Sequence, residues 1–350
     1  MHHVVYCFLV AYSTERTLII KNPIWHSSNK AYEEVFQPVS KSCANTKHGI
    51  HSPWPSPDAL IVELPIIDIV KPRPNLLPPA IPRDLSERII RLHGDPIVWW
   101  ISQFFKYMFR MQPDTAKMLE EVENNLKFMK PIVGLHVRRT DKITMEAEYH
   151  SVEEYMKYIV EYFERLELKE GKKMSVKRVY VASDDATVLP ELVQKYPGYN
   201  FIGDTNVSQS AAESTRALSN SFKGILSDIH LLSKSDYLVC TLSSQVCQLS
   251  YEIMQQNFPD ASDRVKSLDA IWLFGGADEH NQVATIEHTP QSPDELELQI
   301  GDVLSIESNL WNGFSKGRNH RSNQTGLYPG YKTEELLTIG DYPTYPYVEL

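Results

Sequence analysis

The 350-residue sequence predicts an α/β protein whose central part forms a parallel, doubly wound sheet. From residue 131 to about residue 274, short apolar runs typical of strands alternate with longer segments that are apolar at helical spacing. Beyond residue 280 the pattern changes to short stretches separated by turn residues, which favours an all-β module. We therefore divide the chain into an open α/β segment (1–127), a parallel-sheet domain (128–276) and an all-β domain with a C-terminal tail (277–350).

The central part provides the clearest alternation of elements. Strands are predicted at 132–137, 178–182, 200–202 and 236–240, and helices at 152–166, 187–195, 222–233 and 245–256. Because a helix follows each strand, the strands are expected to run parallel in one sheet.

The first part is expected to mix strands and helices. The apolar run 4–12 is about half the ~20 residues that a membrane span needs, and it lacks the basic lead of a signal peptide, so it is expected to be a buried helix or strand. Runs 17–20 and 59–64 resemble strands, and the proline-rich stretch 72–82 is expected to cross the surface. A capped helix is expected to open at 84–87, and a core helix is expected at 96–111.

The last part carries turn signals in a characteristic order. The stretches 294–298, 301–304, 311–313 and 326–329 read Asp-Glu-Leu-Glu-Leu, Gly-Asp-Val-Leu, Trp-Asn-Gly and Gly-Leu-Tyr-Pro. This order and spacing predict an SH3 barrel.

The net charge of −10 does not indicate a nucleic-acid partner, so local basic residues must handle any anionic ligand. The sequence has no Asp-x-Asp triplet and no Cys/His cluster with zinc spacing. We therefore expect no cofactor and no metal.

The end of the strand at 132–137 is the best candidate for a ligand site. Side chains alternate along a strand, so Gly134, His136 and Arg138 share one face. Open α/β sheets bind ligands at the carboxyl edge, and the planar fork of Arg matches phosphate oxygens. The alternative from residue types alone is a surface strand end with solvated cations.

The string His136–Lys142, followed by Glu146 and His150–Met156, closely resembles the α-1,6-fucosyltransferases that add core fucose to N-glycans. The resemblance continues through further motifs in the same order, and it is weak only at 27–57 and 166–175. These motifs are His2–Phe8, His93–Pro96 with Trp99–Trp100, Ser183–Asp185, Leu226–His230, Leu238–Cys247 and Tyr342–Pro346.

The resemblance implies inverting transfer of L-fucose from GDP-β-L-fucose to O6 of the Asn-linked GlcNAc. It also implies a Rossmann-like domain for GDP-fucose and an SH3 domain after it. Glu146 matches the family's base, Lys142 its partner in moving the proton, and Arg138 the group that stabilises the departing GDP. The alternatives are an exposed ion pair for Lys142 and Glu146, and a structural salt bridge for Arg138.

Further positions are implied on the donor and acceptor sides. Ser244 and Gln245 follow a strand and open a helix, whose free N–H groups suit phosphate, although simple N-capping is an alternative. Structural alternatives stay open for four of these residues. His136 could be a core histidine with its hydrogen bonds satisfied, and Arg139 could pair within the domain. Asp184 and Asp185 could cap the next helix. The implied donor-binding residues are His136, Arg138, Arg139, Asp184, Asp185, Asp228, Ser244, Gln245 and Tyr155, and the implied acceptor-binding residues are Asp68, Glu146, Lys142 and Gln245.

The cysteines and sequons fit an oxidising, secretory compartment. By resemblance, Cys240 and Cys247 form a local disulfide, whereas Cys7 and Cys43 are free or pair with each other. Two N-glycosylation sequons begin at Asn206 and Asn323. The resemblance implies a single-pass Golgi protein, for which a homodimer is possible at full length. The chain is expected to be an N-terminally truncated member, with membrane contact only through the missing segment.

Two other functions stay open. A catalytically silent homologue could act as a glycan-binding or adaptor protein. Another GDP-fucose enzyme, such as a protein O-fucosyltransferase, would share strand motifs that bear Arg but would lack the SH3 module. The partners that the resemblance implies are GDP-fucose and an N-glycan on a glycoprotein acceptor.

Overall fold

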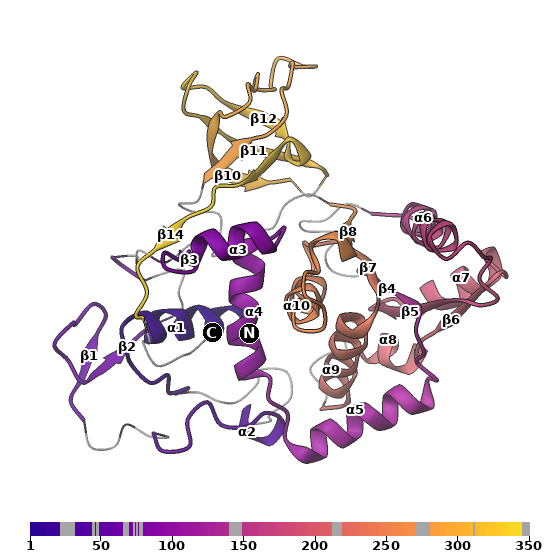
Figure 1. Ribbon diagram of the computed structural model, residues 1–350, viewed down its shortest axis with the longest axis horizontal. Helices are drawn as coiled ribbons and strands as arrows, with labels where there is room; N and C mark the ends of the chain where they lie inside the picture. Colours follow the sequence, from indigo (N-terminus) through magenta and orange to yellow (C-terminus); the bar gives the residue numbers. More distant parts are fainter. Residues whose placement is uncertain are drawn as a thin grey trace.

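The computed structural model describes residues 1–21, 32–43, 46, 49–65, 70–72, 74, 76, 80–139, 149–211, 219–269, 281–310 and 312–344. An α/β segment and a parallel-sheet domain lie side by side, and a β barrel stands at one end of the molecule (Figure 1). The prediction of an α/β protein with a C-terminal all-β SH3 barrel is confirmed.

In the described part of the chain, five parallel strands form the central sheet in the order β6-β5-β4-β7-β8. The strand order confirms the doubly wound topology, and the four predicted strands are all present, with β8 as an unpredicted fifth. The strands are β4 (Ile132–Val137), β5 (Lys177–Ser183), β6 (Tyr199–Ile202), β7 (Tyr237–Cys240) and β8 (Val265–Ser267).

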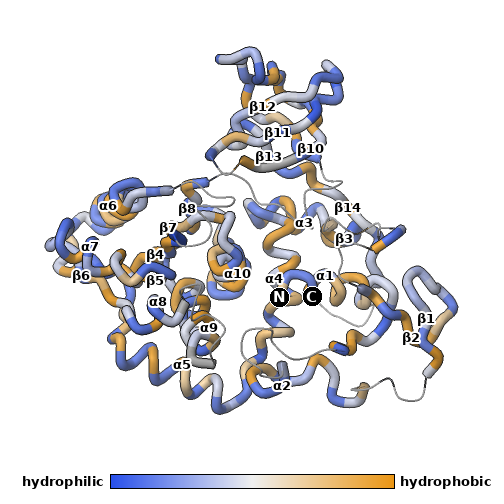
Figure 2. The backbone as a smooth tube through the Cα atoms, turned by 180° about the vertical axis from the view of Figure 1, so that it is seen from behind, coloured by the Kyte–Doolittle hydropathy of each residue, from blue (hydrophilic) through white to orange (hydrophobic). Residues whose placement is uncertain are grey.

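Helices cover both faces of this sheet, as a parallel sheet requires. Val133, Leu135 and Val137 of β4 pack against α6 and α7, whereas the opposite face meets α9 and α10. Figure 2 shows hydrophobic and hydrophilic stretches along α4, α9 and α10, as expected of helices with a buried face. The helices of this domain are α6 (Val152–Glu170), α7 (Val188–Lys195), α8 (Thr205–Ala211), α9 (Ser219–Lys234), α10 (Gln245–Met254) and the 3₁₀ turn η3 (Ser262–Arg264).

The α/β segment is built around α4 (Pro96–Met108). Its aromatic residues are buried against α1 (His2–Ser13), so the apolar run near the start is a helix. The predicted strand at 17–20 is wrong: these residues, of which Thr17 is exposed and the others are half-buried, pair with no strand among the described residues. The other elements are α2 (Tyr32–Val35), β1 (His51–Pro53), β2 (Ile61–Glu63), α3 (Ser86–Leu92) and α5 (Pro113–Asn125).

Two details of the segment differ from the sequence-based expectations. Helix α3 begins near the predicted place, but Leu85 is its N-cap and makes no side-chain cap; the Ser86 hydroxyl instead donates to the Arg83 carbonyl (2.9 Å). The proline-rich stretch does not stay on the surface at its end. Ala80 and Ile81 are fully buried because β3 (Ile81–Pro82) pairs in parallel with β14 (Ile339–Gly340).

The C-terminal tail returns from the barrel to the α/β segment. Tyr342 packs edge-on against Trp100 beside Tyr12, and its hydroxyl donates to the Ala80 carbonyl (2.9 Å). The tail of the predicted third part therefore packs on the first part, as the path of β14 in Figure 1 shows. The predicted boundary at 276–277 falls outside the described residues.

Among the described residues from 281 to 335, five antiparallel strands form the barrel in the order β12-β11-β10-β9-β13. Its core contains Ala284, Leu296, Leu298, Leu304 and Tyr328. The elements are β9 (Asn281–Ala284), β10 (Val303–Asn309), β11 (Phe314–Asn319), β12 (Thr325–Pro329), the 3₁₀ turn η4 (Gly330–Lys332) and β13 (Thr333–Glu335). Across the described ranges, no helix is long and apolar enough to cross a bilayer.

Candidate active site

The order of the parallel strands defines one place where a ligand can enter. The chain passes from β4 to β5 and β6 on one side, then crosses back to form β7 and β8 on the other. The direction of winding therefore reverses between β4 and β7. In doubly wound sheets, the carboxyl edge at this switch point is where ligands bind.

The end of β4 holds the histidine and arginine pattern at this edge. Val133, Leu135 and Val137 lie in one core cluster, which confirms the predicted division of faces. On the other face, a Cβ atom at Gly134 would come within 2.9 Å of Ser235 Oγ and 3.1 Å of Leu232 Cδ2, so a larger residue would force the side chains at the end of α9 to shift. Since β4 ends at Val137, Arg138 and Arg139 lie beyond the strand ladder.

Acidic residues that follow β5, together with Glu191 of α7, orient both arginines. Arg138 Nη1 lies 3.0 Å from Asp184 Oδ2, and the other oxygen of Asp184 accepts the backbone N–H of Arg139 at 2.8 Å. The Arg139 guanidinium is 3.2 Å from Glu191 and 3.7 Å from Asp185. Asp184 therefore holds the chain after β4 and the Arg138 side chain together, whereas Arg139 pairs within the domain.

Asp185 also organises the start of α7. Its Oδ1 accepts the backbone N–H of Thr187 at 2.9 Å and the Thr187 hydroxyl at 2.7 Å. Asp185 therefore fixes the turn before α7 but does not cap it, because Thr187 is the N-cap and the helix has no side-chain cap. The guanidinium carbon of Arg139 also lies 4.9 Å from the ring centre of Tyr149.

His136 is neutral at neutral pH. Burial lowers its pKa to about 4, and the charge of Arg138 acts in the same direction against the opposing effect of Asp184. Its Nδ1 is buried and has no hydrogen-bond partner among the described residues. A neutral imidazole with a vacant nitrogen can exchange a hydrogen bond with a ligand without adding charge.

Asp228 is a buried carboxyl group on α9. Burial raises its pKa to about 7, although a hydrogen bond from the Tyr180 hydroxyl to its Oδ1 (2.6 Å) opposes this shift. Tyr180 pairs with Gly134 in the sheet, so Asp228 lies close to β4, two residues before His136 in register. Sequence reasoning missed Tyr180; a Tyr inside an apolar strand is the signal, because a buried phenol needs a polar partner.

The turn between β7 and α10 lies at the other side of the switch point. Ser244 is the N-cap of α10 by backbone position but makes no side-chain cap; its N–H donates to the Thr241 carbonyl (3.0 Å). Gln245 donates to Gln248 (3.0 Å). Cys240 and Cys247 form the predicted disulfide, with Cα atoms 6.1 Å apart, and it links the end of β7 to the first turn of α10. The remaining cysteines, Cys7 and Cys43, are both free.

Asp269 is a second residue that sequence reasoning missed. Its carboxylate accepts the Ser243 backbone N–H (3.2 Å) and the Ser267 hydroxyl (2.7 Å), while Ser267 Oγ accepts the Leu242 N–H (3.0 Å). Burial raises the pKa of Asp269. The only sequence signal is its position two residues after β8, at the same edge as the other site residues. It shapes the turn that precedes α10.

The remaining predicted residues are placed differently. Tyr155 is 1% exposed in the core beneath the sheet edge, where its side chain hydrogen-bonds with Thr241 and burial raises its pKa. Its contacts are those of a residue that supports the β7–α10 turn from within. Lys142, Glu146 and Asp68 lie outside the described residues. Within the described ranges, no three His, Cys, Asp or Glu side chains are grouped to hold a metal ion.

The fold is a doubly wound α/β domain joined to an SH3 barrel, and comparisons with known proteins identify its family. Residues 1–273 match the family described as alpha-(1,6)-fucosyltransferase N- and catalytic domains, and residues 284–334 match the variant SH3 domain family. The chain belongs to the alpha-(1,6)-fucosyltransferase family.

Two curated relatives carry that family name. The Drosophila melanogaster protein is 51% identical over 346 residues, covering 99% of this chain and 56% of its own length. The Caenorhabditis elegans protein is 37% identical over 338 residues, covering 95% of this chain and 60% of its own. The chain thus spans somewhat more than half the length of the curated relatives it matches.

Among solved structures, POFUT1 in complex with GDP has 14% identity and a TM-score of 0.31, covering 48% of this chain and 49% of that chain. The SH3 domain of yeast NBP2 has 26% identity and a TM-score of 0.16, covering 17% of this chain and 98% of that chain. At these TM-scores neither likeness bears on function.

Proposed function

We propose that this chain transfers L-fucose from GDP-β-L-fucose to O6 of the innermost, Asn-linked GlcNAc of N-glycans, with inversion at the sugar carbon. Membership of the α-(1,6)-fucosyltransferase family supports the reaction class. The observation that carries the donor assignment is the switch-point edge, where His136, Arg138 and the N-terminus of α10 come from the two strands that flank it.

The donor diphosphate is assigned to this edge because the groups present suit an anion. The guanidinium of Arg138 offers a planar pair of donors, and the first turn of α10 offers N–H groups with a partial positive charge. Because His136 is neutral, it can hydrogen-bond the diphosphate without placing a second positive charge beside Arg138. Asp228, on the α9 side, accepts hydrogen bonds from guanine in this proposal, for which its carboxyl group must be ionised.

The ion pair between Arg138 and Asp184 has a consequence for catalysis. Asp184 also binds the Arg139 backbone N–H, so its carboxylate stays in place when a ligand arrives. Arg138 is therefore oriented before GDP-fucose binds. Preorganised charge of this kind stabilises a leaving group without reorganisation during the reaction.

In the proposed reaction, Glu146 accepts the proton of the acceptor O6 while this oxygen attacks C1 of fucose. The bond between C1 and the β-phosphate oxygen breaks on the opposite face, so the configuration at C1 inverts through an oxocarbenium-like transition state. Lys142 passes the proton onward, and Arg138 neutralises the charge that develops on GDP. Both Glu146 and Lys142 belong to the segment that follows Arg139.

The proposed location is the Golgi lumen. The Cys240–Cys247 disulfide supports an oxidising compartment. N-glycans on glycoproteins, the proposed acceptors, are processed in that compartment.

The test is a transfer assay with GDP-fucose and a biantennary N-glycan that ends in exposed GlcNAc, analysed by mass and by linkage. The expected product carries one fucose, in α-1,6 linkage to the innermost GlcNAc. Glu146→Gln should abolish transfer but keep GDP binding by calorimetry, because the base contacts the acceptor. Glu121→Gln, on the exposed face of α5, is the matched control and should transfer normally.

Three results would contradict the proposal. Fucose found at another position or on the protein chain would reassign the acceptor. If the chain binds the glycan but transfers no sugar from any donor tested, it is a glycan-binding protein without catalytic activity. Loss of both GDP affinity and turnover in Glu146→Gln would make Glu146 a structural residue.

A further inference from the structure

The turn between β11 and β12 holds the sequon Asn323-Gln324-Thr325 at an open position. All three residues are exposed, and Asn323 has a left-handed backbone (φ 60°), which asparagine tolerates in tight turns. The turn is held by its own hydrogen bonds, including the Asn323 N–H to the Asn319 carbonyl (2.8 Å). A substituent on this side chain would not disturb the barrel core.

The side chain of Asn323 is oriented with its amide nitrogen available. Its Oδ1 accepts hydrogen bonds from Arg318, with Nε at 3.0 Å and Nη2 as a second donor. Within the described part of the chain, Nδ2 makes no hydrogen bond. Nδ2 is the atom that N-glycosylation modifies, and Arg318 can keep its hold on Oδ1 after modification.

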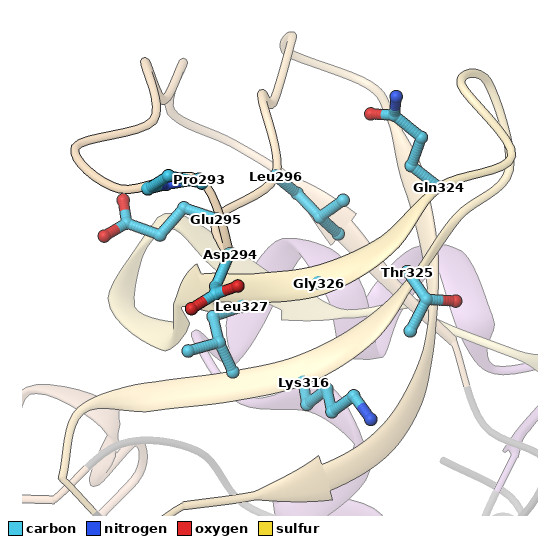
Figure 3. A pocket seen from close by; sticks show the side chains of 9 residues that line it. All are labelled: Pro293, Asp294, Glu295, Leu296, Lys316, Gln324, Thr325, Gly326 and Leu327. Carbon is cyan, nitrogen blue, oxygen red and sulfur yellow. The ribbon is translucent and has the colours of Figure 1, made fainter.

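The protein leaves space next to this turn. A cavity of about 580 Å³ borders the hairpin, and the second and third residues of the sequon, Gln324 and Thr325, line it (Figure 3). Lys316 and Asp294 supply polar groups there, and Leu327 supplies an apolar surface. A sugar residue presents both hydroxyls and C–H faces, so this lining suits the first sugars of a glycan.

The other sequon begins at Asn206, which is exposed, but it continues into a packed helix. Asn206 lies in the first turn of α8, and its Nδ2 donates to Asp204 Oδ1 at 3.0 Å. Ser208 is buried, and Val207 lies so close to α9 that a Cβ atom at Gly224 would come within 2.7 Å of it. A glycan on Asn206 would replace one of the two Nδ2 hydrogens beside a tightly packed helix pair, in a sequon whose third residue, Ser208, is buried.

We propose that Asn323 carries an N-linked glycan and that Asn206 does not. In the modification, Asn323 Nδ2 forms a bond to C1 of a lipid-pyrophosphate-linked oligosaccharide. The C1–oxygen bond to the pyrophosphate breaks, the lipid pyrophosphate leaves, and Nδ2 releases one proton to solvent. The inference rests on the secretory location proposed above and not on the catalytic roles assigned to the switch-point edge.

The barrel position separates this site from the proposed donor site. The barrel stands at one end of the molecule, apart from the strands β4, β5 and β6 (Figure 1). Removal of the glycan is therefore expected to leave GDP affinity unchanged.

The experiment uses the full chain behind a secretory leader in eukaryotic cells, with medium and cell lysate both analysed. Wild type should show one glycan per chain, removed by peptide-N-glycosidase F with conversion of Asn323 to Asp in the peptide map. Asn323→Gln and Thr325→Ala should lose the glycan. Thr325→Ser, which keeps the sequon, and Asn206→Gln should retain it.

The proposal is overturned if residue 323 is unmodified in both fractions, or if residue 206 is occupied, alone or together with residue 323. The lysate keeps the test valid for a variant that fails to be secreted, since N-glycans are added before export. Fucose transfer measured on the same preparations separates the two proposals: an active chain without a glycan refutes only this one, and a glycosylated but inactive chain refutes only the proposed function.

Discussion

Replacing Asp228 with Asn is expected to stabilise the protein at alkaline pH but not at acidic pH. Asp228 is buried on α9 and hydrogen-bonded to Tyr180, and burial raises its pKa from 3.8 to about 7. Well below pH 3.8 the carboxyl is protonated in both the folded and the unfolded chain. Its ionisation therefore does not affect the free energy of unfolding there.

The sign follows from proton linkage. Between pH 4 and pH 7 the unfolded chain loses this proton while the folded chain keeps it, so stability falls as the pH rises and the loss is complete above the folded pKa. A pKa displaced from 3.8 to about 7 corresponds to roughly 4 kcal/mol, at about 1.4 kcal/mol per pH unit. Asn does not titrate and removes this dependence. The difference in free energy of unfolding between Asp228→Asn and wild type should thus grow in favour of the variant by up to roughly 4 kcal/mol from pH 4 to pH 8.

Chemical denaturation at several pH values measures this difference. Any fixed effect of the Asn amide is the same at every pH, so only the slope matters. Tyr180→Phe is the matched variant: it removes the hydrogen bond that lowers the Asp228 pKa, so the pH window should move upward. A difference between Asp228→Asn and wild type that is constant from pH 4 to pH 8 would refute the reasoning.

The same group should couple GDP binding to protons. In the proposed complex the guanine donates hydrogen bonds to ionised Asp228, which lowers its pKa. Binding near pH 6 should therefore release up to one proton, and affinity should rise as the pH approaches 8. Calorimetry in two buffers of different ionisation enthalpy measures the released proton, and Asp228→Asn should release none through this group.

Three further outcomes are expected. Arg138→Lys keeps the charge but loses the planar fork, so turnover should fall by ~10²–10³; near-normal turnover would exclude Arg138 as the phosphate clamp. Transfer should survive EDTA, because the sequence contains no Asp-x-Asp triplet; activity that returns only on addition of Mn²⁺ or Mg²⁺ would contradict this. Tyr342→Ala should lower the free energy of unfolding by roughly 3–5 kcal/mol, since a buried aromatic ring is lost, whereas Tyr342→Phe should cost about 1 kcal/mol for one hydrogen bond; equal losses in a denaturant titration would refute a packing role.

Periodicity was enough to predict the parallel sheet. The run 132–137 is fully buried and ends where predicted, because a central parallel strand is apolar on both faces and needs no partner-specific pattern. The short strand β8 and the pair β3–β14 were not predictable in this way. They have two or three residues each, too few for a period, and they exist only because a partner strand lies beside them.

The sequence by itself also determined which residue types gather at the carboxyl edge, since His136 and Arg138 follow from strand alternation and Asp184 from its place after the next strand. It could not determine their partners. Whether Arg138 pairs with Asp184, whether Asp228 meets Tyr180 and whether Asp269 binds the Ser243 N–H depends on contacts between elements that are 26 to 48 residues apart. Burial then sets the charge of His136 and Asp228. Only the tertiary structure decides these properties, because a pKa depends on how much water and which charges surround the group, and local sequence specifies neither.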